Sequence, residues 1–200
     1  MSRRETTDVV LVLRGGGEYT VEHVTRLVNQ IGRKHPVWVY TDVGDIPGVE
    51  TVPLLHGWPG WWSKMEMFRH PRPFLYMDLD TTVVRPLKRI IEAAQPHSFV
   101  ALRDVYRGDK NPGVLQSSIL YSNGSHRGLY EAYRDNPRNI PGGDQIFMEK
   151  HVENPVFWQD ITDEISSFKK PTNRDPSVWI FHGKPRPWDV EKQYKGKIRT

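Results

Sequence analysis

The sequence contains no cysteine, which excludes disulfide bonds, thiolate catalysis and cysteine-bound metals. It also contains no apolar run near the ~20 residues that a membrane-spanning helix needs. The apolar run at residues 9–13 follows two arginines but is too short for the core of a signal peptide. We therefore expect a protein without a membrane span that works in a reducing compartment, the cytoplasm.

Internal repeats, low-complexity tracts and linkers are also absent from the 200 residues. Hydrophobic residues at 37% and charged residues at 26% are typical of a soluble globular protein, and we expect a single domain over residues 1–200. The net charge of +4 favours phosphate-bearing partners, either a nucleotide or a nucleic acid. Several basic residues lie near the two ends: Arg3, Arg4, Lys192, Lys195, Lys197 and Arg199.

Strand-like and helix-like spacings of apolar residues alternate along the chain. Strands are predicted at residues 8–14, 37–40, 49–54, 74–77, 98–102, 114–121, 156–158 and 178–181. Helices are predicted at residues 20–31, 62–69, 86–94, 125–134 and 143–152. Because a strand, a helix and a strand in succession favour parallel pairing, the pattern predicts one α/β domain with a Rossmann-like, mostly parallel central sheet flanked by helices.

Two acidic residues end the apolar run of the stretch PFLYMDLDTTVV at residues 73–84. Residues two apart in an extended segment point to the same side, so Asp78 and Asp80 would face one point. Two carboxylates that close repel each other unless a proton or a cation lies between them, and a hard divalent cation takes oxygen ligands. The alternative is a polar turn in which the acids are solvated or cap the next helix.

Two loops are unusual in composition. Residues 15–17 are three glycines between the first strand and the first helix, where backbone amides can approach a phosphate at a helix N-terminus. The loop lacks the dinucleotide-binding and P-loop signatures, so a plain tight turn is the alternative. Residues 56–62, HGWPGWW, carry three tryptophans that either pack into the core or line a site.

Polar clusters follow the predicted strand ends and one helix start. They are Asp78 with Asp80, Asp144 with Gln145 after a glycine pair, and His182 with Lys184. Open α/β sheets bind ligands at the carboxyl ends of their strands. Two carboxylates and an imidazole suit Mn²⁺ or Mg²⁺, and neighbouring basic residues would neutralise a diphosphate.

Six segments, in this order, resemble the GT-A glycosyltransferases, and most of all the branch of glycogenin and the bacterial lipopolysaccharide galactosyltransferases. The segments are VLVLRGGGEYTVEHVTRL, WSKME, YMDLDT, NPGV, GGDQ and FHGKPRPW. The resemblance implies a GT-A fold and transfer of a sugar, with retention of configuration, from a nucleotide-diphosphate donor that we expect to be UDP-linked. It also implies Mn²⁺ or Mg²⁺ at the DxD motif.

The same resemblance implies roles for individual residues. Asp78, Asp80 and His182 would bind the metal, and Asp144 and Gln145 would act on the sugar as the catalytic residues. The donor would contact Arg14, Gly15, Gly16, Tyr19, Lys64, Asp78, Asn111, Gly183, Lys184 and Arg186. The last motif is shortened relative to the family, so either Lys184 or Arg186 would bind phosphate. The glycine triplet replaces polar residues of the family's first loop, which leaves the contacts to the base open.

The acceptor would be a hydroxyl group, either of a hydroxymethylated base in DNA or of a glycan. Two other functions stay open. Asp78, Asp80, Thr82 and Val83 also fit the DxDxT motif of haloacid dehalogenase-like phosphatases, in which Asp78 would be the nucleophile. The tryptophans and basic ends would alternatively serve a non-catalytic nucleic-acid-binding domain, although no known nucleic-acid-binding motif is present.

Overall fold

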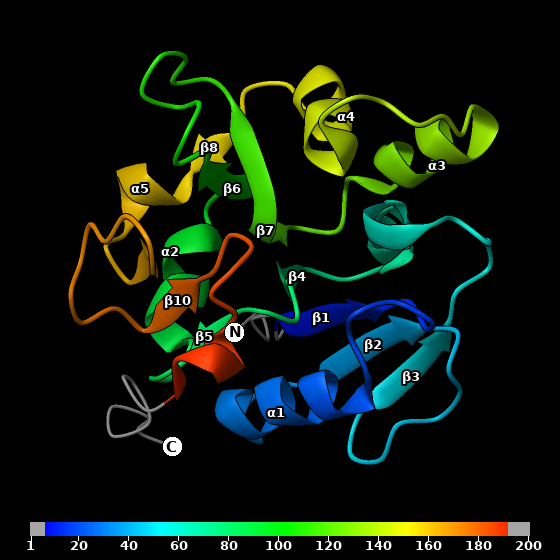
Figure 1. Ribbon diagram of the computed structural model, residues 1–200. Helices are drawn as coiled ribbons and strands as arrows, with labels where there is room; N and C mark the ends of the chain where they lie inside the picture. The colour runs from blue at the N-terminus through cyan, green and yellow to red at the C-terminus, as the bar shows by residue number, and fades with distance from the viewer. Residues whose placement is uncertain (1–6, 192–200) are drawn as a thin grey trace, which may run out of the picture.

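The computed structural model describes residues 7–191, and the basic residues near both ends of the chain lie outside this range. A seven-stranded sheet with the order β3-β2-β1-β4-β7-β6-β8 forms the centre of the fold (Figure 1). Its strands are β1 (Asp8–Leu13), β2 (Val37–Thr41), β3 (Glu50–Pro53), β4 (Phe74–Met77), β6 (Phe99–Arg103), β7 (Leu115–Ser122) and β8 (Val156–Phe157). All neighbouring pairs are parallel except those that β7 makes with β4 and β6, so the predicted mostly parallel sheet is confirmed.

A second, three-stranded sheet joins two segments that are far apart in the sequence. β5 (Thr82–Val83) pairs with β10 (Val178–Ile180), which pairs in turn with β9 (Ile165–Ser167). Sequence analysis missed β5 and β9 because two or three residues are too few to show an alternating pattern. The pairing of β5 with β10 brings the segment after β10 beside the turn that carries Asp80.

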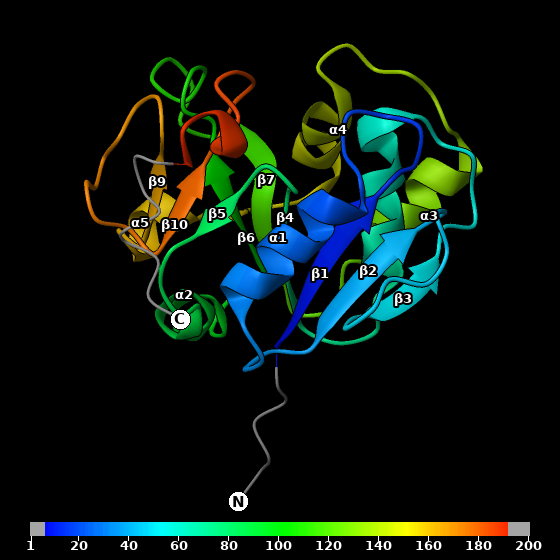
Figure 2. The same cartoon turned by 60° about the horizontal axis from the view of Figure 1, so that its bottom comes forward.

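Helices cover both faces of the large sheet (Figure 2). One face packs against α1 (Val21–Ile31) and α2 (Lys88–Ala94). The other packs against η1 (Gly60–Arg69), α3 (Arg127–Asp135) and α4 (Gly143–His151). Two short helices, α5 (Trp158–Ile161) and η2 (Pro187–Asp189), complete the fold. None of the helices in residues 7–191 is both long and apolar enough to cross a membrane.

The helix predicted at residues 62–69 begins two residues earlier and is a 3₁₀ helix. Hydrogen bonds between residues three apart open and close it, from Trp62 N to Pro59 O (3.1 Å) and from His70 N to Met67 O (3.0 Å). Apolar spacing over ten residues separates 3.0 from 3.6 residues per turn poorly, which explains why the sequence indicated only a helix.

Candidate active site

A cavity of about 940 Å³ opens at the edge of the large sheet where β1 and β4 end and β7 begins. Most of the residues assigned to a site from the sequence line it: Arg14, Gly15, Gly16, Tyr19, Lys64, Asp78, Asp80, Asp144, Gln145, His182, Gly183 and Arg186. Asn111 and Lys184 do not. The Asn111 side chain instead accepts a hydrogen bond from Gly113 N (3.2 Å), and Lys184 is exposed. Of the two basic residues proposed for phosphate binding, the structure therefore brings Arg186 to the cavity.

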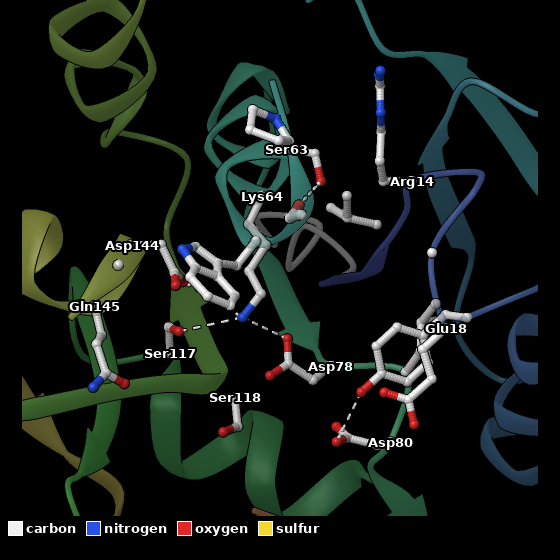
Figure 3. A pocket seen from close by; sticks show the side chains of 18 of the residues that line it. Arg14, Glu18, Ser63, Lys64, Asp78, Asp80, Ser117, Ser118, Asp144 and Gln145 are labelled. Atoms are coloured by element: carbon white, nitrogen blue, oxygen red, sulfur yellow. Dashed lines mark hydrogen bonds and ion pairs between the residues drawn. The ribbon is translucent and has the colours of Figure 1, made fainter. Parts of the chain in front are cut away.

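Lys64 of η1 lies between two carboxylates (Figure 3). Its Nζ is 2.8 Å from Asp78 Oδ1 and 3.4 Å from Asp144 Oδ2, and it donates a hydrogen bond to Ser117 Oγ (3.3 Å). Burial acts to lower the pKa of Lys64, but Asp144 and Asp78 more than offset it, so the pKa lies above its ordinary value. The side chain is therefore a fixed positive charge at the floor of the cavity.

Asp78 is held by its own strand and by η1. Besides Lys64, it accepts a hydrogen bond from the Tyr76 hydroxyl (2.6 Å). Burial raises the pKa of Asp78 to about 6, with Lys64 acting against the rise and Asp80 adding to it. An additional cation beside Asp78 would lower this pKa, because a cation favours the ionised form of a carboxylate.

Asp80 carries a different set of partners. Its Oδ2 accepts hydrogen bonds from the Tyr19 hydroxyl (3.0 Å) and from Arg186 Nη1. The same guanidinium also binds Glu18, with Nη2 2.6 Å from Glu18 Oε2. Burial acts to lower the pKa of Arg186, but its hydrogen bonds to Glu18 and the charge of Asp80 help to raise it above its ordinary value.

His182 follows β10 and reaches the cavity from the second sheet. Its Nδ1 accepts a hydrogen bond from the Gln116 amide (2.6 Å). Burial lowers the pKa of His182, although the charge of Asp80 acts in the opposite direction. The ring is therefore neutral at neutral pH, and this hydrogen bond places its proton on Nε2. Binding of a metal by Nε2 would require the other tautomer, in which Nδ1–H donates to the Gln116 amide oxygen after that amide turns over.

Three buried polar atoms in this cavity have no hydrogen-bond partner within the described part of the chain. They are Asp144 Oδ2, which Lys64 contacts as an ion pair at 3.4 Å but without a hydrogen bond, His182 Nε2 and Gln116 Oε1. Buried polar atoms in native proteins are almost always hydrogen-bonded, to the protein, to water or to a ligand. Their gathering in one cavity is what a site for a polar ligand requires.

The predicted metal ligands Asp78, Asp80 and His182 line the same cavity, but they are not assembled as a metal site. Across residues 7–191, no group of three His, Cys, Asp or Glu side chains is arranged to hold a metal ion. Lys64 and Arg186 neutralise the two aspartates instead. The donor set still fits Mn²⁺ or Mg²⁺, because carboxylate oxygens suit both ions and His182 Nε2 is a buried nitrogen without a partner among the described residues.

The glycine loop after β1 is held by a residue that sequence analysis did not identify. Asp42, directly after β2, accepts a hydrogen bond from Gly15 N (2.7 Å) and pairs with Arg14 (3.2 Å). A Cβ on Gly15 would come within 2.7 Å of Val43 Cγ1, so a side chain there would require Val43 to shift. The loop is therefore a fixed wall of the cavity, and β2 being parallel to β1 puts Asp42 beside it.

The turn between Asp78 and Thr82 is fixed from α1 by a second residue that the sequence did not indicate. Arg26 Nη2 donates hydrogen bonds to Leu79 O (2.8 Å) and Thr81 O (2.7 Å). An arginine on the polar face of an amphipathic helix is normally expected to be solvated. Only the packing of α1 beside β5 shows that Arg26 fixes the turn instead.

Of the three tryptophans in residues 56–62, two pack into the core and one lines the cavity. Trp58 and Trp62 are 9% and 3% exposed and belong to the core, where Trp62 stacks on Tyr133 with ring centroids 4.5 Å apart. Trp61 is 56% exposed and lines the cavity.

The glycine pair before Asp144 is required by the backbone. Gly142 and Gly143 have φ values of 87° and 72°, in the left-handed region that other residues rarely adopt. A Cβ on Gly143 would also lie 2.7 Å from Trp61 Nε1. The pair lets α4 begin against Trp61 and places Asp144 in its first turn, beside Lys64.

Comparison with known proteins identifies the fold. No protein-family model and no curated protein sequence match the chain. Among solved structures, the glycosyltransferase GlyE of Streptococcus pneumoniae TIGR4 superimposes with a TM-score of 0.69 at 13% identity, over 98% of this chain and 62% of GlyE. The galactosyltransferase LgtC, solved with donor and acceptor sugar analogs, gives 0.64 at 11% identity over 97% of both chains. The bifunctional glycosyltransferase WbbM gives 0.65 at 12% identity, over 94% of this chain and 47% of WbbM.

The chain thus spans less than two thirds of GlyE and less than half of WbbM, but nearly all of LgtC. Identities of 11 to 13% establish the fold alone. The resemblance seen in the sequence and the arrangement of the sheet agree with these structures: the chain has the GT-A fold of glycosyltransferases.

Proposed function

We propose that this chain is a glycosyltransferase that moves a sugar from a nucleoside diphosphate sugar, with uridine as the nucleoside, to a hydroxyl group of an acceptor. The observation that carries the proposal is the gathering of Asp144 Oδ2, His182 Nε2 and Gln116 Oε1 in one cavity of a GT-A fold, each buried and without a hydrogen-bond partner among the described residues. A sugar with several hydroxyl groups and a metal-bound diphosphate would supply those partners.

The charge of the cavity supports a requirement for a divalent cation. Four carboxylates line it (Glu18, Asp78, Asp80 and Asp144) against three cations (Arg14, Lys64 and Arg186), which leaves one net negative charge with His182 neutral. A donor diphosphate would add further negative charge. Asp78, Asp80 and His182 would hold Mn²⁺ or Mg²⁺, which when bound stabilises the charge of the leaving diphosphate.

The residues of the chain then have distinct tasks. Lys64 and Arg186 bind the diphosphate, on which negative charge grows as the bond from the anomeric carbon to the phosphate oxygen breaks. Asp144 accepts hydrogen bonds from sugar hydroxyls, and Gln145 lies near the anomeric carbon. The acceptor oxygen forms the new bond to that carbon as the nucleoside diphosphate leaves, and the acceptor proton passes to the departing phosphate oxygen. Retention of configuration follows the family that the motifs resemble.

We propose a glycan as the acceptor. Trp61 is largely exposed at the cavity, beside the start of α4, where its face can stack on a sugar ring. The LgtC structure contains an acceptor sugar analog. A hydroxymethylated base in DNA is the competing acceptor, supported by the net charge of +4. Incubation of the protein with UDP-sugars and either oligosaccharides or hydroxymethylated DNA, followed by mass spectrometry, separates the two.

Binding of UDP tests the donor site directly. We expect calorimetry to detect UDP binding that is stronger with Mn²⁺ than with EDTA, and we expect Asp80→Asn to weaken the binding in Mn²⁺ by at least about tenfold. Asp135→Asn is the matched control, because Asp135 is an exposed aspartate at the end of α3. Unchanged binding in Asp80→Asn would refute the metal assignment. Turnover of p-nitrophenyl phosphate without any UDP binding would favour the phosphatase alternative.

A further inference from the structure

Arg186 forms an ion pair with Asp80, the carboxylate that the proposed function assigns to a divalent metal ion. Its guanidinium forms two parallel contacts with Glu18, from Nε to Oε1 (2.9 Å) and from Nη2 to Oε2 (2.6 Å). The third nitrogen, Nη1, donates to Asp80 Oδ2. One side chain thus joins the loop after β1, the turn after β4 and the segment after β10.

The three nitrogens of Arg186 are not equally fixed. The contacts with Glu18 are bidentate, which is the arrangement that suits a guanidinium and a carboxylate. Asp80 receives only Nη1, and its Oδ2 already accepts a hydrogen bond from Tyr19. Nη1 is therefore the nitrogen that can change partner without breaking either contact with Glu18.

The backbone that carries Arg186 is anchored independently of Asp80. Trp188, two residues later, lies against α1, with its ring 4.3 Å from His23 and 5.8 Å from the Arg26 guanidinium. Pro187, which lies between Arg186 and Trp188 in the chain, is buried. The segment can therefore stay in place when the Arg186 side chain changes its contacts.

Lys64, another cation of the cavity, forms its ion pairs with carboxylates other than Asp80. Lys64 Nζ pairs with Asp78 and Asp144, and it is 14% exposed. In the described part of the chain, the ion pair of Asp80 is with Arg186. At Asp80 the internal cation that would compete with a divalent metal is therefore Arg186, whereas at Asp78 it is Lys64.

We propose that Arg186 is a displaceable counter-ion of Asp80, which couples metal binding to donor binding. Without a donor, Nη1 neutralises Asp80 and disfavours a divalent cation there. When the donor is bound, Nη1 donates its hydrogen bond to the diphosphate instead, and Asp80 becomes available to the metal. The inference rests on the proposed function, since it assigns the diphosphate and the metal to this cavity. Arg186 is then a positioning residue as well as a phosphate contact.

The test measures Mn²⁺ binding to the full chain from the electron paramagnetic resonance signal of free Mn²⁺, with and without UDP. In the wild type we expect weak binding of Mn²⁺ alone and a large gain with UDP. In Arg186→Gln we expect Mn²⁺ alone to bind about 5- to 150-fold more tightly than in the wild type, the range typical of coupling between two sites. UDP should then add less to Mn²⁺ affinity than it does in the wild type.

Two further variants separate charge competition from general effects. Arg186→Lys keeps a cation near Asp80 and should bind Mn²⁺ alone as weakly as the wild type. Arg89→Gln removes one positive charge from an exposed ion pair with Glu164 and should match the wild type in both measurements. Circular dichroism confirms that each variant is folded.

The outcomes distinguish this inference from the proposed function. If UDP binds but Arg186→Gln binds Mn²⁺ alone no better than the wild type, Arg186 does not compete for Asp80 and the inference is wrong. If UDP binds to no variant with or without Mn²⁺, the proposed function is wrong, whereas the comparison of Mn²⁺ binding between wild type and Arg186→Gln still tests the competition.

Discussion

Replacing Lys64 by methionine tests the charge arrangement at the floor of the cavity. The substitution keeps most of the apolar stem but removes the ammonium group, so Asp78 and Asp144 lose their shared ion pairs of 2.8 and 3.4 Å. Ser117 Oγ loses its donor at the same time. Because Lys64 is only 14% exposed, solvent screens these contacts little.

Removal of one partner from a buried ion pair typically costs about 3–5 kcal/mol, since the other charge stays buried without compensation. For a protein of this length, about 1 kcal/mol corresponds to about 2–4 °C in melting temperature. We therefore expect Lys64→Met to melt roughly 10 °C below the wild type at pH 7. Urea denaturation followed by circular dichroism gives the corresponding free energy of unfolding.

A matched lysine provides the control. Lys88 is 77% exposed and lies 3.9 Å from Glu92, so Lys88→Met should change the free energy of unfolding by at most about 0.5 kcal/mol. Adding Asp78→Asn to Lys64→Met removes one of the two uncompensated carboxylates and should restore part of the lost stability, which a double-mutant cycle measures.

The pH dependence gives an independent check. The pKa of Asp78 is about 6 in the folded protein, and loss of Lys64 raises it further. Its unfolded value is about 3.9, so the folded state binds the extra proton as the pH falls. The defect of Lys64→Met should therefore shrink between pH 7 and pH 5. A variant as stable as the wild type at pH 7, or a defect that grows in acid, would refute the proposed charge arrangement.

Three further predictions follow from residues around the cavity and beyond it. Gly143→Ala should lose at least about 1–2 kcal/mol of stability, because alanine is strained in the left-handed region. It should also push Trp61 aside and so lower donor hydrolysis. The control Gly128→Ala in α3 should stabilise the protein by up to about 1 kcal/mol. Trp61→Ala should raise the acceptor KM about fivefold, the effect of about 1 kcal/mol of stacking, while Trp61→Phe retains most of the affinity; equal KM values in all three proteins would contradict the acceptor site. Burial lowers the pKa of His126, so the unfolded state takes up its proton first as the pH falls below about 6.5. Stability of the wild type should then fall more steeply than that of His126→Asn between pH 7 and 5.5 in urea titrations, and parallel curves would show that His126 contributes nothing.

Sequence patterns determined the order of the larger elements because their apolar spacing is local. The run before Asp78 predicted a strand, and β4 ends at Met77. Thr20 and Gly32 marked the two ends of α1, which runs from Val21 to Ile31. Since parallel strands end at a common edge, these predictions also placed the glycine loop and Asp78 on one side of the sheet.

The contacts of the site depended on tertiary structure. Arg186 and Asp80 are 106 residues apart, and they meet because β10, which the sequence predicted, pairs with β5, a strand of two residues that is too short to show a period. The sequence could not choose between Lys184 and Arg186, since two residues of an irregular segment have no predictable direction. Nor could it show that Lys64 joins Asp78 to Asp144, or that Trp61 faces the cavity while Trp58 and Trp62 enter the core.

The sequence by itself thus determined which residue types are available for the chemistry and at which edge of the sheet most of them lie. Only the tertiary structure decided their pairing, with Lys64 on Asp78 and Arg186 on Asp80. The physical reason is that apolar periodicity reports on contacts within one element, whereas the ion pairs of this cavity join elements whose relative positions are set by packing of the whole domain.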